Sequence, residues 1–518
     1  MSIVDLNLVD ADPFNGKQFD FCICGSGPAG MTLALKLGQR HSVCLLEAGA
    51  MQYTQESQDN YKGTSTGKSY FPLDACRLRY FGGSSGHWGG ACRPLDEEDF
   101  KKKPFVKYSG WPIGKTDLDP YLMEARDILD IDPEVSMTLP PCDERWMPKF
   151  PEYRETRFWL SKPTRFGDKY RKDIAESENI HCFINANVTD IRLNGDHSAI
   201  ERYEVSNYRH QRFDARAKVF ILAAGGLENP RILLNANRQD PRGVGNQNDL
   251  VGKFFTDHPH QHLGEYVLED KPHEDCANDQ IYWHGPPHGK AFQGHFLKPT
   301  LEFQQHQRVL NYALSISPAS VMPKPRDTGF KHTLRELLCR SETLRDTAER
   351  IKNGAVSCFD NVDGVINIQS EQEPNPESRI TLASENDAFG LPRLNMHWQF
   401  TDLDRFTIRD AAWRAAERFA TAHTGRVRLE RWLHPKHISI PGFADHTASI
   451  VAGPHHMCTT RMSDSPATGV VDKNCKVFGL DNFYIGGSSV FSTGGFSNPT
   501  FTIVQLALRL AEHLQGKA

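Results

Sequence analysis

The sequence predicts an α/β protein with a parallel sheet that binds a nucleotide. The hydrophobic run 19–24 leads into the glycine-rich turn Gly25-Ser26-Gly27-Pro28-Ala29-Gly30, and an apolar helical stretch follows it. A second hydrophobic run, 43–46, ends at Glu47. Strand, glycine turn, helix, second strand and terminal acid occur in the order of a Rossmann-like dinucleotide-binding unit.

Each glycine of the turn has a physical role in such a unit. Gly25 permits the tight turn, Gly27 lets the backbone approach a pyrophosphate, and Gly30 lets the helix pack close to the strand. The N-terminus of the helix stabilises the phosphate charge, and Glu47 stands where an acid meets a ribose hydroxyl. This unit alone leaves FAD and NAD open, because both cofactors contain adenosine diphosphate.

Further motifs decide between the two cofactors. They are a second glycine-rich loop at 79–90, a late strand that ends in small residues at 220–230, the segment 248–259, and the C-terminal runs His455-His456-Met457-Cys458-Thr459-Thr460-Arg461-Met462 and Ser497-Asn498-Pro499-Thr500. In this order they resemble the glucose-methanol-choline (GMC) oxidoreductase family over nearly the whole chain. The C-terminal runs are most similar to the pyranose oxidase, fructose dehydrogenase and gluconate dehydrogenase branch. The resemblance implies bound FAD.

Chain length and the resemblance together predict two discontinuous domains, as in the GMC fold. A chain of 518 residues is too long for one compact domain. We expect a Rossmann-like FAD-binding domain from residues 15–115, 175–262 and 446–518. The remaining residues, 116–174 and 263–445, should form an α+β substrate-binding domain and a lid.

Periodicity places several elements in these domains. We expect helices at 118–131, 335–352 and 404–422, and strands at 180–193, 378–382 and 394–400. The aromatic and proline-rich run 140–163 is typical of a loop or lid.

The resemblance also implies which residues contact the cofactor. They are Gly25, Gly27, Pro28, Ala29, Gly30, Glu47, Gly82, Gly83, Ser84, His87, Trp88, Gly89, Val188, Ala224, Gly225, Gly487, Ser488, Asn498, Pro499 and Thr500. In pyranose oxidases the histidine of a Thr-His-Trp sequence carries the flavin covalently. Gly86 precedes His87 here, so non-covalent FAD is favoured, although a covalent link through His87 stays open.

Alcohol oxidation needs a base that is neutral near pH 7, and histidine suits that task. By position in the family pattern, His455 is the base and Asn498 the second member of the catalytic pair. Asparagine can hydrogen-bond the substrate oxygen but cannot take its proton. Consecutive strand residues point to opposite sides, so we expect only one of His455 and His456 to face the flavin. Cys458 stands where the family usually has glycine.

We therefore expect an FAD-dependent oxidoreductase that oxidises a CH–OH group, a secondary hydroxyl of a sugar or glycoside, with O2 or a quinone as electron acceptor. The alternatives are a primary alcohol on an aminoglycoside-like intermediate and a hydroxynitrile lyase that binds FAD without redox chemistry. Bleaching of the flavin by substrate in the absence of oxygen separates the oxidoreductases from the lyase. A NAD-dependent dehydrogenase leaves the C-terminal pattern unexplained.

Composition limits the classes of partner that this protein is expected to bind. The net charge of −5 shows no basic excess for nucleic acid or an anionic membrane, and no segment is long enough to span a bilayer. The acidic N-terminus lacks the features of a signal peptide, so we expect a cytoplasmic protein. No cysteine spacing fits zinc or an iron–sulfur cluster, and we assign no metal. His258 and His260 are expected to be structural and Lys101 to Lys103 to be solvated. The oligomeric state stays open.

Overall fold

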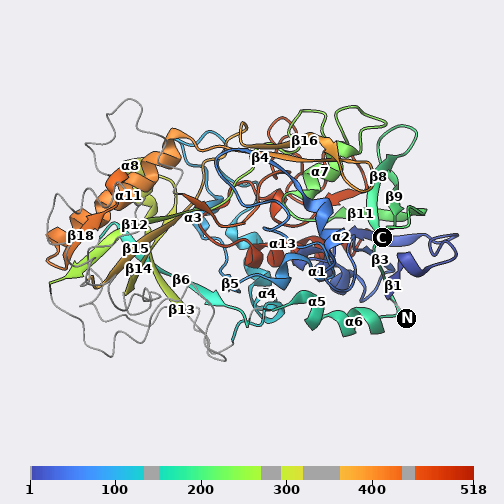
Figure 1. Cartoon of the computed structure of the whole chain (residues 1–518), viewed down its shortest axis with the longest axis horizontal. Coiled ribbons are helices and arrows are strands. Elements are labelled where there is room, and N and C mark those ends of the chain that lie inside the picture. The colour runs from blue at the N-terminus through green and yellow to red at the C-terminus, as the bar shows by residue number, and fades with distance from the viewer. Residues whose placement is uncertain are drawn as a thin grey trace, which may run out of the picture.

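The computed structural model describes residues 3–132, 151–162, 164–269, 293–318, 362–433 and 450–517. The molecule is elongated (Figure 1). The parallel sheet with helices α1 and α13 lies towards one end, and a large antiparallel sheet with helix α11 lies at the other.

The parallel sheet brings together segments from distant parts of the chain. Its strands run in the order β1-β7-β3-β2-β11-β20, and every neighbouring pair is parallel. Helix α1 (Pro28–Leu37) follows the glycine turn and packs against the C-terminal helix α13 (Thr500–Leu514). The strands are β1 (Ile3–Asp5), β2 (Phe19–Cys24), β3 (Val43–Leu46), β7 (Ile180–Ile184), β11 (Ala217–Leu222) and β20 (Phe483–Ile485). The order and direction of these strands confirm the predicted α/β fold class.

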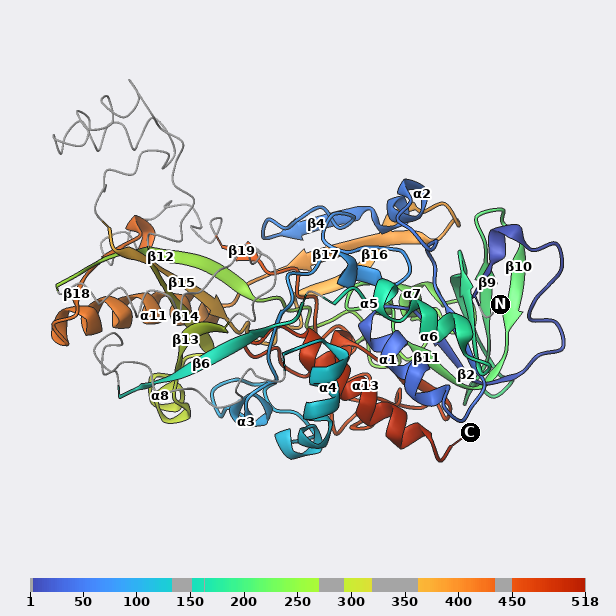
Figure 2. The same cartoon turned by 90° about the horizontal axis from the view of Figure 1, so that it is seen from below.

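The antiparallel sheet has the order β18-β12-β15-β14-β13-β6-β5, and β19 also pairs with β12. Helix α11 (Asp402–Thr421) covers it, and Thr401 caps the N-terminus of that helix. The strands are β5 (Ala91–Cys92), β6 (Tyr153–Leu160), β12 (Pro259–Leu268), β13 (Gln293–Pro299), β14 (Tyr312–Pro318), β15 (Gly364–Ser370), β18 (Gly425–Leu429) and β19 (Val451–Ala452). Figure 2 shows β18, β12, β15, β14 and β13 beside one another at the end of the molecule remote from the parallel sheet.

Two small sheets complete the strand arrangement. One contains β8 (Asn187–Leu193), β9 (Ile200–Ser206) and β10 (Arg212–Ala215), and the other contains β4 (Gly63–Gly67), β16 (Arg379–Asn386) and β17 (Pro392–Trp398). The shorter helices are α2 (Gln55–Gln58), α3 (Glu97–Phe100), α4 (Leu122–Ile128), α5 (Phe166–Lys169), α6 (Arg171–Glu176), α7 (Glu228–Asn235) and α8 (Leu301–Gln307).

Three predicted elements differ from the structure. The helix expected at 118–131 is shortened to α4, because Pro120 lies in a preceding 3₁₀ turn and offers no N–H for a helical hydrogen bond. The strand expected at 180–193 is two strands, β7 and β8, separated at Asn185, which has a φ of 56°. The loop expected at 140–163 contains strand β6, which pairs with both β13 and β5. The helix expected at 335–352 lies outside the described residues.

The structure also corrects the expectation that Lys103 is solvated. It was expected to be solvated, yet its side chain is 3% exposed and forms an ion pair with Glu371, which is equally buried. Asn311 donates its backbone N–H to the same carboxylate. A run of three lysines by itself predicts a solvated face. The ion pair is not visible in the sequence, because the partner of Lys103 lies far along the chain.

Candidate active site

A cavity of about 1000 Å³ lies where the carboxyl ends of the parallel strands meet the antiparallel sheet. Cys24, Glu47 and Ala223 line it at or just beyond the ends of β2, β3 and β11. Phe158 and His260 line it from the antiparallel sheet. In open parallel sheets, ligands bind at this end of the strands.

The cavity gathers most residues that the sequence assigns to the site. Gly30 and Gly82 do not line it. The residues that do are Gly25, Gly27, Pro28, Ala29, Glu47, Gly83, Ser84, His87, Trp88, Gly89, Val188, Ala224, Gly225, His455, Gly487, Ser488, Asn498, Pro499 and Thr500.

The three glycines of the turn have different surroundings. A Cβ on Gly25 would lie 2.6 Å from the Ala223 carbonyl oxygen, and one on Gly30 would lie 1.8 Å from the Gly25 oxygen. Both glycines are therefore required by close packing within the protein. A Cβ on Gly27 would meet no protein atom within 4 Å, although Gly27 lines the cavity. The space beside Gly27, at the N-terminus of α1, fits the pyrophosphate of a dinucleotide.

Glu47 is held in place by hydrogen bonds. Its carboxylate accepts from the Ser26 hydroxyl at 2.6 Å, from the Ser26 backbone N–H at 3.1 Å and from the Gly49 backbone N–H at 2.8 Å. Burial raises the pKa of Glu47, and the hydrogen bonds from Ser26 and Gly49 act against that rise. The geometry ties the acid at the end of β3 to the glycine turn.

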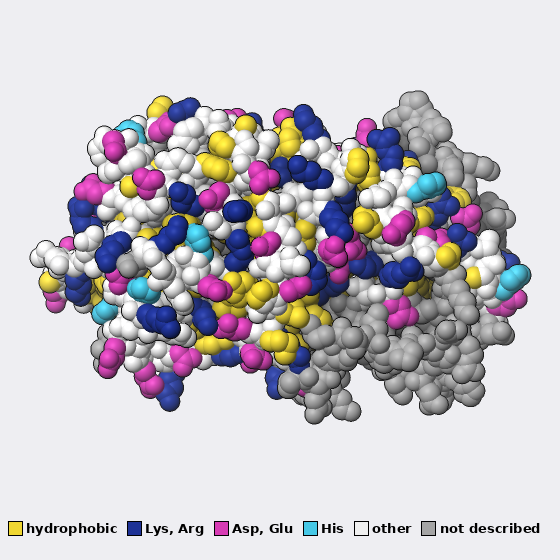
Figure 3. All heavy atoms as spheres, turned by 180° about the vertical axis from the view of Figure 1, so that it is seen from behind, with side chains coloured by type: hydrophobic (Ala, Val, Ile, Leu, Met, Phe, Trp, Pro, Cys, Tyr) yellow, Lys and Arg dark blue, Asp and Glu magenta, His cyan; other side chains and the backbone are white. Residues whose placement is uncertain are grey.

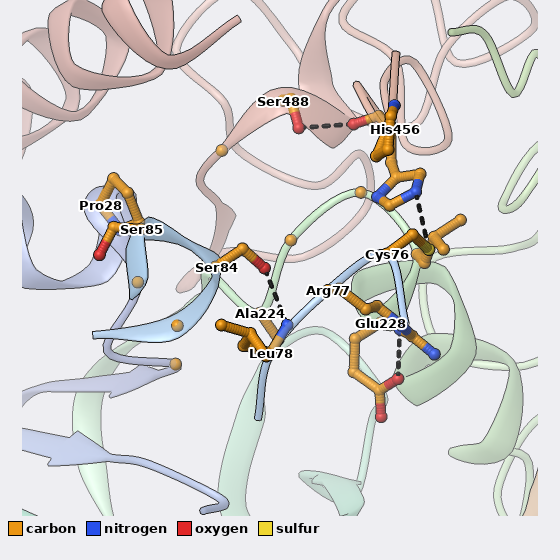
Figure 4. Close-up of a pocket in the computed structure, with 18 of the residues that line it drawn as sticks. Pro28, Cys76, Arg77, Leu78, Ser84, Ser85, Ala224, Glu228, His456 and Ser488 are labelled. Atoms are coloured by element: carbon orange, nitrogen blue, oxygen red, sulfur yellow. Dashed lines mark hydrogen bonds and ion pairs between the residues drawn. The ribbon is translucent and has the colours of Figure 1, made fainter. Parts of the chain in front are cut away.

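The second glycine-rich loop is fixed from two sides. The Ser84 hydroxyl accepts a hydrogen bond from the Leu78 backbone at 3.1 Å (Figure 4). Arg165 donates to the carbonyls of Ser85 and Trp88, both at 2.8 Å. The Trp88 indole donates to the Thr164 carbonyl at 2.8 Å. These bonds hold the loop that carries His87 along the cavity wall.

A buried charge cluster forms another part of the wall. Arg77, Arg79 and Arg231 each pair with Glu228, and Arg231 also pairs with Asp387 at 2.5 Å. Burial raises the pKa of Glu228, but the three arginines outweigh it and bring the pKa down to about 2. Three cations against two anions leave one net positive charge, which favours an anionic ligand in the cavity.

His455 belongs to a histidine cluster at the start of β12. Its Nδ1 lies 3.0 Å from Nδ1 of His258, whose Nε2 lies 3.4 Å from the Gly494 carbonyl oxygen. A carbonyl only accepts, so His258 carries its proton on Nε2, and its Nδ1 accepts from His455. This arrangement leaves Nε2 of His455 unprotonated and able to take a proton. Burial, with His258 and His260 nearby, holds the pKa of His455 well below its usual value.

Asp257 positions this cluster. It is fully buried, and its Oδ1 accepts backbone hydrogen bonds from His258 at 2.6 Å and from Gly453 and His455 at 3.0 Å. Its Oδ2 accepts from the Tyr70 hydroxyl. Burial raises the pKa of Asp257 to about 6, while these hydrogen bonds act in the opposite direction. The carboxylate therefore fixes the backbone that presents His455.

Both consecutive histidines line the cavity, and the expectation that only one of them faces the flavin stays a prediction. Strand β19 ends at Ala452, so the alternation of a strand does not extend to His455 and His456. The His456 ring lies 3.5 Å from the Cys76 sulfur, and its carbonyl accepts from Ser488 at 2.6 Å (Figure 4). His456 therefore contacts the wall formed by the segment that contains Cys76.

Asn498 lies in the cavity wall with its amide engaged. It donates to the Ala91 carbonyl at 3.0 Å and accepts from the Gln369 amide at 2.8 Å. An amide has a second N–H, which remains available to a substrate oxygen. Gln369 and Ala91 thus set the orientation of Asn498.

Cys458 replaces the family glycine in a backbone conformation that favours glycine. Its φ is 69°, and the Thr256 hydroxyl donates to its sulfur at 3.1 Å. A non-glycine residue in this region costs about 1–2 kcal/mol. The structure therefore keeps the glycine-type backbone although a cysteine occupies the position.

The low pKa of buried His258 predicts that the folded protein loses stability in acid. Burial lowers its pKa from 6.5 to about 3, so between these values the unfolded chain binds a proton that the folded protein does not. Lowering the pH from 7 to 5 should therefore cost about 2 kcal/mol at this residue alone. Urea unfolding at both pH values should show a smaller loss for His258→Gln than for wild type. An equal loss in both proteins would contradict this cause.

The structure adds cavity residues that the sequence analysis did not select. They come from the segment before the second glycine-rich loop, from the first residue of that loop and from the start of α7: Tyr61, Cys76, Arg77, Arg79, Glu228 and Arg231. The sequence signal for them was weak, because two arginines beside a glycine-rich loop are common on surfaces. Asp257 was visible beside His258 and Pro259, but its role depends on contacts with residues near 455.

Comparisons with known proteins agree with this geometry. A family model described as GMC oxidoreductase matches residues 374–507. A 2-methyl-1,2-propanediol dehydrogenase from Mycolicibacterium austroafricanum is 23% identical and covers 97% of this chain and 96% of its own length. A pyranose 2-oxidase from Lyophyllum shimeji is 24% identical over 70% of this chain and 55% of its own. The solved formate oxidase of Aspergillus oryzae RIB40 matches with a TM-score of 0.58 at 15% identity, over 98% of this chain and 99% of its own.

Fold and cavity together define an α/β protein with a cavity that fits a dinucleotide. Residues 374–507 match the GMC oxidoreductase family, and the relatives are named dehydrogenases and oxidases, which supports an FAD-dependent alcohol or sugar oxidoreductase.

Membrane-spanning helices and metal sites can be assessed among the described residues. None of the helices among them is both long and apolar enough to cross a membrane. In the same residues, no group of three His, Cys, Asp or Glu side chains is arranged to hold a metal ion. Basic and acidic side chains are interspersed over the described part of the face in Figure 3.

Proposed function

We propose that this protein oxidises a secondary hydroxyl of a sugar or glycoside to a carbonyl, with His455 as the general base. The proposal depends chiefly on one observation. His455 donates from Nδ1 to His258, and His258 donates to the Gly494 carbonyl, so Nε2 of a neutral His455 is left unprotonated in the cavity wall. A neutral imidazole in that state can accept the hydroxyl proton of an alcohol. Bound FAD supplies the hydride acceptor, flavin N5.

The other residues have binding roles in this proposal. The space beside Gly27 would receive the pyrophosphate, and Glu47 would meet a ribose hydroxyl. Asn498 would donate its remaining N–H to the substrate oxygen and so hold the reacting carbon in position. The name pyranose 2-oxidase of one relative supports a sugar as the substrate.

The alternative substrate is a primary alcohol, including one on an aminoglycoside-like intermediate. It is supported by the relative named for 2-methyl-1,2-propanediol, whose oxidisable hydroxyl is primary. A hydroxynitrile lyase is the alternative outside redox chemistry. Sugars, glycosides and primary alcohols should be screened without oxygen for loss of flavin absorbance, and the reduced protein then mixed with O2 or a quinone. Reduction by primary alcohols but by no sugar would overturn the sugar proposal.

We expect the flavin to be bound without a covalent link. His87 lines the cavity, but Gly86 precedes it in place of the threonine of pyranose oxidases. Acid precipitation of the purified yellow protein should therefore release the flavin into the supernatant. Yellow colour that stays in the pellet, and that His87→Ala transfers to the supernatant, would instead establish attachment through His87.

A further inference from the structure

Tyr70 contacts the residue that holds the general base in place, although Tyr70 does not line the active-site cavity itself. Its hydroxyl donates a hydrogen bond to Oδ2 of Asp257. Burial and the negative charge of Asp257 raise the pKa of Tyr70 well above its usual value. The hydroxyl therefore keeps its proton, and it is the donor because an ionised carboxylate only accepts.

The Tyr70 ring is fixed beside this carboxylate by aromatic packing. The ring lies edge-on to Trp398, with centroids 5.1 Å apart, and edge-on to Phe255 at 6.0 Å. The Trp398 indole donates to the side-chain oxygen of Gln372 at 2.9 Å, and the same oxygen accepts from the Asp257 backbone at 3.1 Å. Two rings and one shared amide therefore fix Tyr70 and Asp257 relative to each other.

The second oxygen of Asp257 contacts the backbone that carries the base. Oδ1 accepts from the N–H groups of His258 at 2.6 Å and of Gly453 and His455 at 3.0 Å. Hydrogen bonds to an ionised acceptor are roughly twice as strong as those between neutral groups. Protonation of Asp257 would therefore weaken all three bonds at once. Asp257 does not line the cavity either, so its charge acts on the reaction through His455.

Asp257 is the group of this cluster that takes up a proton first as the pH falls. Burial raises its pKa to about 6, and the hydrogen bond from Tyr70 is the largest influence that lowers it. Burial holds the pKa of His455 well below its usual value, and burial lowers the pKa of His258 to about 3 and that of His260 to about 4. The base therefore stays neutral at a pH where Asp257 is already protonated.

The other ionisable groups near Tyr70 do not change charge around pH 6. Burial raises the pKa of the Cys76 thiol to about 12. Burial, with Arg77 nearby, lowers the pKa of His456 to about 3. Arg77 also faces Tyr70, and its guanidinium is paired with Glu228. Asp257 is thus the group whose titration in this range bears on the base.

We propose that Tyr70 is a positioning residue for the reaction: its hydrogen bond keeps Asp257 ionised, and the ionised carboxylate holds His455 where it can take the substrate proton. The loss of activity in acid then reports protonation of Asp257 and not of the base itself. This inference rests on the proposed function, since it concerns the control of the base in that reaction.

The first test is a titration of Asp257 in the holoenzyme by infrared difference spectroscopy. Wild type should show a carboxyl that takes up its proton near pH 6 and that is missing in Asp257→Asn. In Tyr70→Phe the midpoint should rise by about one to two pH units, as the loss of one hydrogen bond to a charged group predicts. An unchanged midpoint in Tyr70→Phe would overturn the proposal.

Tyr170→Phe is the matched control. Tyr170 is half-buried like Tyr70, but its hydroxyl donates to the Ile128 carbonyl at 3.1 Å, and it does not line the cavity. Its variant should keep the wild-type midpoint of Asp257. A midpoint that rises equally in both variants would show a general effect of losing a tyrosine hydroxyl and would contradict the role of Tyr70.

The second test follows anaerobic flavin reduction from pH 5.5 to pH 9 at saturating substrate. Tyr70→Phe should be about three- to thirtyfold slower than wild type at pH 6.5, as the shifted midpoint predicts. At pH 9 the two rates should be nearly equal, because Asp257 is then ionised in both proteins. Tyr170→Phe should follow the wild-type profile.

The outcomes separate this inference from the proposed function. No loss of rate in Tyr70→Phe at pH 6.5, or the same loss at pH 6.5 and pH 9, would overturn the positioning role. A shifted Asp257 midpoint in a protein whose flavin is reduced by no sugar or alcohol would instead overturn the proposed oxidation and leave the link between Tyr70 and Asp257 supported.

Discussion

His455→Ala should slow anaerobic flavin reduction by about 10² to 10⁴. The variant removes the ring whose Nε2 is left unprotonated by the hydrogen bond from Nδ1 to His258. FAD should stay bound, because the glycine turn and Glu47 are unchanged. Stopped-flow absorbance of the flavin, at saturating substrate, measures the effect.

Two neighbouring variants serve as controls for this assignment. His456→Ala should lose much less rate, because the His456 ring contacts Cys76. Asn498→Ala should also lose less, since it removes a positioning group that Gln369 and Ala91 hold in place. A slow His456→Ala beside an active His455→Ala would show that His456 is the base.

Gly27→Ala should fold normally and lose FAD. Gly27 has a φ of −68°, which any residue adopts, and a Cβ there would meet no protein atom within 4 Å. The added methyl would instead occupy the space where the pyrophosphate approaches the N-terminus of α1. We expect the dissociation constant of FAD to rise at least tenfold, or about 1.4 kcal/mol, while the Tm of the FAD-free protein stays unchanged.

Two other glycines make this experiment specific. Gly195→Ala is the matched control, because its Cβ also meets open space but lies outside the cavity. Gly30→Ala should impair folding itself, since its Cβ would lie 1.8 Å from the Gly25 oxygen. Wild-type affinity for FAD in Gly27→Ala would show that the pyrophosphate does not lie beside this residue.

Local chemistry explains why the sequence predicts the nucleotide unit well. The turn from Gly25 to Gly30 and the acid at Glu47 lie within one strand-helix-strand segment, so spacing and residue type determine their geometry. Helix α11 is predicted for the same reason, because its period and its cap at Thr401 are local.

Long-range pairing explains what the sequence does not predict. Strand β6 pairs with β13, and Lys103 is neutralised by Glu371, across large separations in the chain. His262, Asn367, Ser315 and Phe296 lie opposite one another only because four neighbouring strands adopt one register. Hydrophobic periodicity does not specify such a register, so this row of side chains emerges only from the folded structure.

The most direct test of the account is anaerobic flavin reduction by a sugar or alcohol and by the same compound deuterated at the reacting carbon. Transfer of hydride from that carbon predicts that the flavin absorbance is lost and that the deuterated compound reduces it more slowly. The account would be contradicted if the flavin kept its full absorbance with every sugar and alcohol while the protein cleaved hydroxynitriles.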